Sequence, residues 1–199
     1  MTQKQSKVVM LHGRWPERIN GQLIADIPLC NSNNEGNWMG WTKKRLEEKG
    51  YSVVCPMILD AWKAPYSDWK KVMDSLKIDE DTTLVGLSAG GAVCVRWLDE
   101  AGTKIKKLIL IAPGSKYTAT DADPLPSKKE FYDFEIDPKL KGQIAEQVVI
   151  FVSNDSPEIL KSVELYREAF DAKIIKLEER GHFSFLIPQL PELVEEVLR

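Results

Sequence analysis

The stretch Gly86-Leu87-Ser88-Ala89-Gly90 has the pattern G-x-S-x-G and separates two segments of different character. Residues 82–85 before it are typical of a short buried strand, and residues 91–98 after it are typical of a helix. At a strand–turn–helix junction this pattern predicts a strained turn that lifts the serine hydroxyl above the sheet edge. Small residues are needed two positions before and after the serine, because the turn brings strand and helix backbones together. The alternative is an ordinary tight turn with a capping serine.

The rest of the chain alternates between apolar runs and segments with helical spacing of apolar residues. Strands are predicted at residues 7–11, 52–56, 82–85, 107–113, 148–152 and 173–177. Helices are predicted at about residues 38–50, 66–76, 91–98, 157–170 and 191–198. This order predicts the α/β class, as a three-layer, doubly wound sheet of about six parallel strands flanked by helices. Ligands of such sheets bind outside the carboxyl ends of the strands, so candidate site residues are sought there.

Length and composition exclude several classes of protein. A chain of 199 residues predicts one domain, residues 1–199, whose core needs no disulfide or metal to hold it. The net charge of −3 and the pI near 5.6 argue against a nucleic-acid surface, which requires a basic face. The N-terminal residues show no signal-peptide pattern, and no apolar run is long enough to span a membrane. We therefore expect no nucleic-acid or membrane partner, and a monomer or small homo-oligomer.

Three cysteines, Cys30, Cys55 and Cys94, are odd in number and follow no metal-binding or redox pattern. Cys55 lies in a predicted strand and Cys94 in a predicted helix, so we expect both to be small core residues. Together with the missing signal peptide, this predicts a reducing, cytoplasmic location. No metal site is expected, and no G-x-G-x-x-G follows the first strand, so a nucleotide-binding, flavodoxin-like alternative is disfavoured.

Candidate catalytic residues follow the predicted strands. Ser88 ends one strand, Asp155 follows another, and His182 follows the last, in the chain order Ser, Asp, His of α/β-hydrolases. In this arrangement His182 takes the proton of the Ser88 hydroxyl, and Asp155 orients the imidazole and stabilises its cation. Alternatively, Asp155 caps the following helix and His182 is a surface histidine. Four other carboxylates compete for the acid role: Asp60, Asp121, Asp123 and Glu158.

Two backbone N–H groups are candidates for an oxyanion hole. The N–H of Ala89 lies at a predicted helix start. Gly13 lets the backbone at the end of the first strand approach the substrate, so that the N–H of Arg14 becomes the second donor. The alternative is a plain strand-to-loop turn. His12 is interpreted as a structural or loop-positioning residue and not as a base.

Several of these segments resemble the small single-domain serine hydrolases of the α/β-hydrolase superfamily that include retinoblastoma-binding protein 9. The similar segments are residues 8–13, 36–46, 85–91, 153–157 and 181–183. The resemblance implies a minimal α/β-hydrolase without a large cap, with nucleophile Ser88, acid Asp155 and base His182, acting on small activated esters. Leu87 departs from the histidine that the family often has there, which changes the pocket floor. The loop from Arg14 to Gly36 also looks longer than usual.

We expect a serine hydrolase that cleaves small ester-type acyl substrates through an acyl-enzyme, as a carboxylesterase without a cofactor. A thioesterase or small peptidase with the same mechanism, and a catalytically weak interaction module on the same fold, remain alternatives. The segment from Gly114 to Gln147 is too short for a cap domain. It forms either a thin lid, with Phe131, Tyr132 and Phe134 as apolar anchors, or ordinary loop packing. Trp38, Trp62, Tyr66 and Trp69 either line the site or belong to the core.

Overall fold

The computed structural model describes residues 5–19, 21–23, 36–119, 126–184 and 186–199. Its centre is a six-stranded sheet in which every neighbouring pair of strands is parallel. In spatial order the strands are β4 (Ser52–Val54), β1 (Lys7–Leu11), β5 (Thr82–Leu87), β6 (Lys107–Ile111), β7 (Val149–Val152) and β8 (Lys173–Lys176). The inner strands are buried along almost their whole length, which explains why their sequences are continuous apolar runs.

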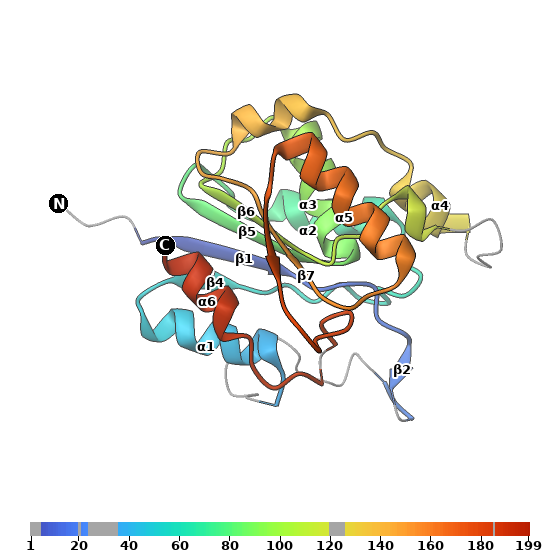
Figure 1. Ribbon diagram of the computed structural model, residues 1–199, viewed down its shortest axis with the longest axis horizontal. Helices are drawn as coiled ribbons and strands as arrows, with labels where there is room; N and C mark the ends of the chain where they lie inside the picture. The colour runs from blue at the N-terminus through green and yellow to red at the C-terminus, as the bar shows by residue number, and fades with distance from the viewer. Residues whose placement is uncertain (1–4, 20, 24–35, 120–125, 185) are drawn as a thin grey trace.

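Helices cover both faces of this sheet (Figure 1). On one face lie α1 (Trp38–Glu48) and α6 (Pro191–Leu198), which pack against each other. On the other face lie α2 (Tyr66–Ser75), α3 (Ala89–Ala101) and α5 (Pro157–Phe170). The predicted three-layer α/β class is therefore confirmed, and the carboxyl ends of β1, β5 and β7 lead directly to the candidate site residues.

Capping residues define the ends of the helices that matter most for the site. Ser156 caps α5, where its Oγ accepts the Ile159 N–H at 3.4 Å, and Pro157 takes the first helical position. Asn37 caps α1 by accepting the backbone N–H groups of its first turn. Gly50, with φ of +85°, follows the end of α1, as the sequence predicts.

Two connecting segments contain short elements that the sequence analysis did not predict. The loop after β1 includes a hairpin of β2 (Arg18–Ile19) and β3 (Gln22–Leu23), and its residues 24–35 lie outside the described residues. The connection between β6 and β7 contains η2 (Lys116–Thr118), α4 (Pro126–Tyr132) and η3 (Pro138–Gln143). No large cap is present among the described residues.

The aromatic residues proposed either as site or as core residues prove to be mostly core. Trp38, Tyr66 and Trp69 are buried, whereas Trp62 is half-buried. Phe131 in α4 is also buried, and its ring lies 5.6 Å from that of Trp69 and 6.2 Å from that of Tyr66. These contacts join α4 to α2, as the ordinary-packing alternative for this segment requires.

The expectation for the cysteines is only partly right. Cys94 is a free thiol buried in α3, and burial raises its pKa to about 12. Cys55 is half-buried and disulfide-bonded, so its prediction as a reduced core residue is wrong. Cys30 lies outside the described residues. Because a disulfide is typical of oxidising compartments, the cysteines no longer support the predicted reducing location.

Among the helices of the described residues, none combines the length and the apolar character needed to cross a bilayer.

Candidate active site

Ser88 occupies a strained turn between β5 and α3. Its backbone has φ of +51° and ψ of −115°, a conformation that costs a non-glycine residue about 1–3 kcal/mol. Hydrogen bonds to β6 and to the loop that follows it hold the turn in place. The Ser88 N–H donates to the Ile111 carbonyl at 2.9 Å, and the Ser88 carbonyl accepts the Gly114 N–H at 3.0 Å. Ser88 is thus fixed at the carboxyl end of the sheet.

Close backbone approaches explain the glycines on either side of Ser88. A Cβ on Gly86 would lie 2.6 Å from backbone atoms of Gly90 and Gly91. A Cβ on Gly90 would lie 2.5 Å from the His12 carbonyl oxygen. Both distances are shorter than real Cβ contacts, so only glycine fits at either position without a backbone shift. This is the close contact of strand and helix that the sequence pattern predicts.

His182 lies between Ser88 and Asp155. Its Nε2 is 2.9 Å from Ser88 Oγ, and its Nδ1 is 2.6 Å from Asp155 Oδ2. The Asp155 side chain is only 6% exposed, whereas that of His182 is 43% exposed, so the base faces solvent and the acid does not. With the imidazole proton on Nδ1 facing the carboxylate, Nε2 is left as an acceptor for the serine hydroxyl. The structure therefore brings these three side chains into one hydrogen-bonded chain.

The competing carboxylates do not occupy this place. Asp60 pairs with Lys63 at 3.0 Å, and the exposed Glu158 lies in the first turn of α5. Asp121 and Asp123 lie outside the described residues. Asp155 also does not cap α5, because Ser156 does so.

Hydrogen bonds that the sequence analysis missed join the loop before Asp155 to the loop before His182. Ser153 Oγ accepts the Arg180 N–H at 3.0 Å and donates to Asn154 Oδ1 at 2.8 Å. Asn154 Oδ1 also accepts the Gly181 N–H at 3.2 Å. We call the Ser153 and Asn154 side chains, with these two N–H groups, the loop latch. These residues stand directly before Asp155 and His182 in the chain, which is the signal in the sequence that points to them.

The loop that carries His182 is also held from its other side. Trp38, at the start of α1, donates from Nε1 to the Phe183 carbonyl at 3.0 Å, and its N–H donates to the Ile187 carbonyl at 2.8 Å. Phe183 is buried with φ of +52°. Contacts with both β7 and α1 thus position the imidazole.

His12 is a fully buried residue at the end of β1. It lies within 2.7 Å of the Gly13 carbonyl through Nδ1, and its Nε2 accepts the Ile58 N–H at 3.0 Å. Burial lowers the pKa of His12 to about 4. A neutral ring that donates at Nδ1 and accepts at Nε2 satisfies both contacts, which agrees with the loop-positioning role predicted for His12.

Gly13 and Arg14 lie beside Ser88. A Cβ on Gly13 would lie 3.1 Å from Ser88 Cβ, so glycine permits the close approach of this loop. The Arg14 guanidinium donates to the Ala64 carbonyl at 2.8 Å and lies 4.3 Å from the centre of the Phe131 ring. These contacts anchor the loop that carries the Arg14 N–H. Across from it, Ala89 begins α3, where the first N–H groups of a helix have no intrahelical acceptor.

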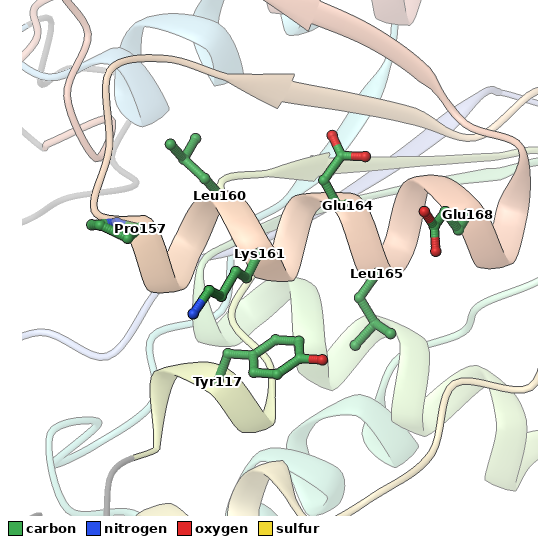
Figure 2. A pocket seen from close by; sticks show the side chains of 7 residues that line it. All are labelled: Tyr117, Pro157, Leu160, Lys161, Glu164, Leu165 and Glu168. Carbon is green, nitrogen blue, oxygen red and sulfur yellow. The ribbon is translucent and has the colours of Figure 1, made fainter.

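Two hollows meet at Ser88, His182 and Arg14. One, of about 380 Å³, continues along mostly apolar side chains, and the other, of about 430 Å³, continues along mixed side chains that include two carboxylates. A larger hollow of about 730 Å³ lies over the outer surface of α5 and contains no proposed catalytic residue. Figure 2 shows that its side chains spread to both sides of α5, with Leu160 and Glu164 on one side and Tyr117 and Leu165 on the other. We therefore place the candidate site at the two hollows beside Ser88.

In the part of the chain that the structure describes, no group of three or more His, Cys, Asp or Glu side chains is arranged to hold a metal ion.

Comparison with solved structures supports the fold. The ydeN gene product from B. subtilis is 19% identical with a TM-score of 0.74, and the match covers 98% of this chain and 97% of that chain. Est1E from Butyrivibrio proteoclasticus with bound ferulic acid is 13% identical with a TM-score of 0.63, covering 98% and 87%. Carboxylesterase CesB (YbfK) from Bacillus subtilis is 15% identical with a TM-score of 0.53, covering 98% and 82%. A search of curated proteins finds no match.

Comparison with protein-family models gives the family itself. The serine hydrolase model matches residues 27–186, which include Ser88, Asp155 and His182. The match thus spans most of the chain, from the segment before α1 to the loop after His182. The chain belongs to the serine hydrolase family.

Proposed function

We propose that the protein is an esterase that cleaves small ester substrates with Ser88 as nucleophile, His182 as general base and acid, and Asp155 as the residue that orients His182. The observation that carries this proposal is the hydrogen-bonded chain of 2.9 Å and 2.6 Å that joins the three side chains. The family match supports the use of a serine. Two similar structures, one of a carboxylesterase and one of Est1E with ferulic acid, support ester chemistry.

The proposed acylation begins when His182 Nε2 takes the proton of Ser88 Oγ as that oxygen attacks the ester carbonyl carbon. The carbonyl electron pair moves to its oxygen, which the N–H groups of Ala89 and Arg14 stabilise. When the tetrahedral intermediate collapses, the bond to the alcohol oxygen breaks. His182 donates its Nε2 proton to that oxygen, and the alcohol leaves.

In the deacylation half, water attacks the acyl-enzyme and gives a proton to His182. The second intermediate then releases the carboxylic acid, and Ser88 recovers its proton from His182. Asp155 stabilises the imidazolium that forms in each half of the reaction. Thioesters and amides pass through the same type of intermediate as esters. An assay with all three kinds of substrate therefore identifies which leaving group the protein prefers.

Labelling with a fluorophosphonate, followed by hydrolysis of p-nitrophenyl acetate, tests the proposal. The wild-type protein should be labelled and active, whereas Ser88→Ala and His182→Ala should lose labelling. Both variants should also lose about 10⁴-fold or more in kcat. Ser75→Ala, which changes an exposed serine at the end of α2, is the matched control and should behave as wild type. A wild-type protein that is neither labelled nor active would favour the interaction-module alternative.

A further inference from the structure

We infer that the apolar hollow beside Ser88 binds one apolar group of the ester, of about the size of a substituted aromatic ring, and that Leu186 determines this specificity. The inference rests on the proposed function, since it concerns the substrate of the same serine. It adds a substrate class, namely esters with one ring-sized apolar half and one small or polar half.

The chemical difference between the two hollows carries the inference. The first hollow extends from Ser88 and His182 along the side chains of Trp15, Pro16, Leu87, Phe183 and Leu186, with Arg14 and Ser184 as its other polar side chains and no carboxylate among its described lining residues. The second hollow extends to Ile159, Thr118, Tyr132, Ser156 and the carboxylates Asp155 and Glu158. An apolar group gains more by leaving water in the first hollow, because in the second it would also cover two carboxylates that need solvent or a hydrogen bond.

The volume of the apolar hollow limits the size of this group. An apolar cavity of roughly 150 Å³ accommodates benzene. The hollow of about 380 Å³ therefore has room for one ring with a substituent, or for a short branched chain. Trp15, Leu87 and Phe183 are at most 7% exposed, so the inner wall is fixed by core packing.

Leu186 is the lining residue that the fold does not need. Its side chain is 68% exposed, so it contributes little to the core in the free protein. A bound apolar group would cover this exposed leucine and gain its burial. Substitution of Leu186 should therefore alter substrate preference without altering stability.

The exposed Leu59 offers a matched control. It is 79% exposed and lines a hollow with Met57, Ile58 and Trp62 in which none of the three proposed catalytic residues takes part. Leu59→Asp and Leu186→Asp thus make the same chemical change at two exposed leucines, and only the second is at the proposed site.

The experiment compares two series of esters, followed by acid release at constant pH. The acyl series contains ethyl acetate, ethyl butyrate and ethyl phenylacetate, and the alcohol series contains methyl, butyl and benzyl acetate. In the wild-type protein, we expect one of the two series to show a ring preference. In that series kcat/KM for the ring-bearing ester should be about 10-fold or more higher than kcat/KM for the smallest ester. That series also shows which half of the ester enters the apolar hollow. Leu186→Asp should lower kcat/KM for the ring-bearing ester about 10-fold more than for the smallest member of the same series, whereas Leu59→Asp should keep the wild-type preference.

Two outcomes would overturn the inference and leave the proposed function intact. The first is a labelled, active wild-type protein with no ring preference in either series. The second is a preference that survives in Leu186→Asp or falls equally in Leu59→Asp. By contrast, a wild-type protein without labelling or turnover would contradict the proposed function itself.

Discussion

At the scale of single residues, the two oxygens of Asp155 have separate contacts. Oδ2 faces His182 Nδ1 at 2.6 Å, and Oδ1 accepts the Ser156 N–H at 2.7 Å. The second contact fixes the plane of the carboxylate at the start of α5, so the first oxygen stays directed at the imidazole. The carboxylate therefore needs both oxygens, one for its own position and one for the histidine.

Replacement of Asp155 by asparagine should lower kcat by about 10⁴-fold with little loss of stability. An amide keeps the shape and an acceptor for the Ser156 N–H. If its NH₂ faces Nδ1, however, the imidazole proton is forced to Nε2, which then cannot accept from Ser88. Ester hydrolysis and thermal unfolding of the same sample measure the two effects. A loss smaller than 10-fold would show that another carboxylate, such as Glu158, orients His182.

At the scale of elements, the site depends on how the loops after β7 and β8 are joined. The loop latch ties Ser153 and Asn154 to the backbone just before His182, while Trp38 in α1 holds the backbone just after it. A displacement of about 1 Å in a catalytic group can cost on the order of 100-fold in rate. The latch side chains should therefore act as positioning residues.

Asn154→Ala should lower kcat about 10-fold or more and leave KM nearly unchanged, because it frees the Gly181 N–H without touching the hollows. Asn154 is exposed, so the fold should tolerate the change. Asn154→Asp keeps an oxygen acceptor for the Gly181 N–H and should restore most of kcat. Equal kcat values for Asn154→Ala and wild type would remove the latch from the mechanism.

The elements that the sequence predicted are those with a strong local pattern. Strands β1, β5 and β6 are apolar beyond one or two polar residues at their starts, because both faces of the sheet are covered. Ser156 and Gly50 mark helix ends through signals that act within a few residues. The hairpin of β2 and β3 has two residues in each strand, which is too short for a periodicity to be visible. The sequence between the two strands, Asn20-Gly21, is typical of a two-residue hairpin turn, and this signal was not used in the prediction.

Contacts between loops that are distant in the sequence are a second kind of feature that could not be predicted from the sequence. The candidate Ser88, Asp155 and His182 were found because their residue types and order match a known chemistry. The latch and the Trp38 contact have no such pattern, since their partners are backbone N–H and carbonyl groups 27 and 145 residues away. The disulfide of Cys55 was missed for a similar reason, because spacing alone does not distinguish a paired cysteine from a core residue.

At the scale of the whole molecule, the stability of the fold depends on a histidine that remains neutral. His12 is enclosed by the rings of Trp15 and Trp69, at 6.1 and 5.3 Å, and by the backbone of Gly13 and Ile58. Protonation would place a charge in this apolar environment. It would also turn Nε2 into a donor that faces the Ile58 N–H, itself a donor. The folded protein therefore resists protonation of His12 more than the unfolded chain does.

This difference predicts the direction of a pH effect. The pKa of His12 is about 4 in the folded protein and near 6.5 in the unfolded chain. Between these values the unfolded state binds more protons, so the free energy of unfolding falls as the pH is lowered from about 6.5 towards 4. From pH 7 to pH 4.5, His12 should account for a loss of about 2–3 kcal/mol.

Urea unfolding without reductant, at pH 7 and at pH 4.5, measures this contribution when wild type is compared with His12→Gln. Glutamine retains an amide donor and acceptor but does not titrate. The variant should therefore be less stable than wild type at pH 7, and its stability should fall less on acidification. Carboxylates titrate in both proteins and therefore contribute equally to both pH dependences. The difference in the free energy of unfolding between wild type and His12→Gln thus changes with pH because of His12. Parallel pH curves for wild type and His12→Gln would show that His12 is already protonated, or solvated, in the folded protein.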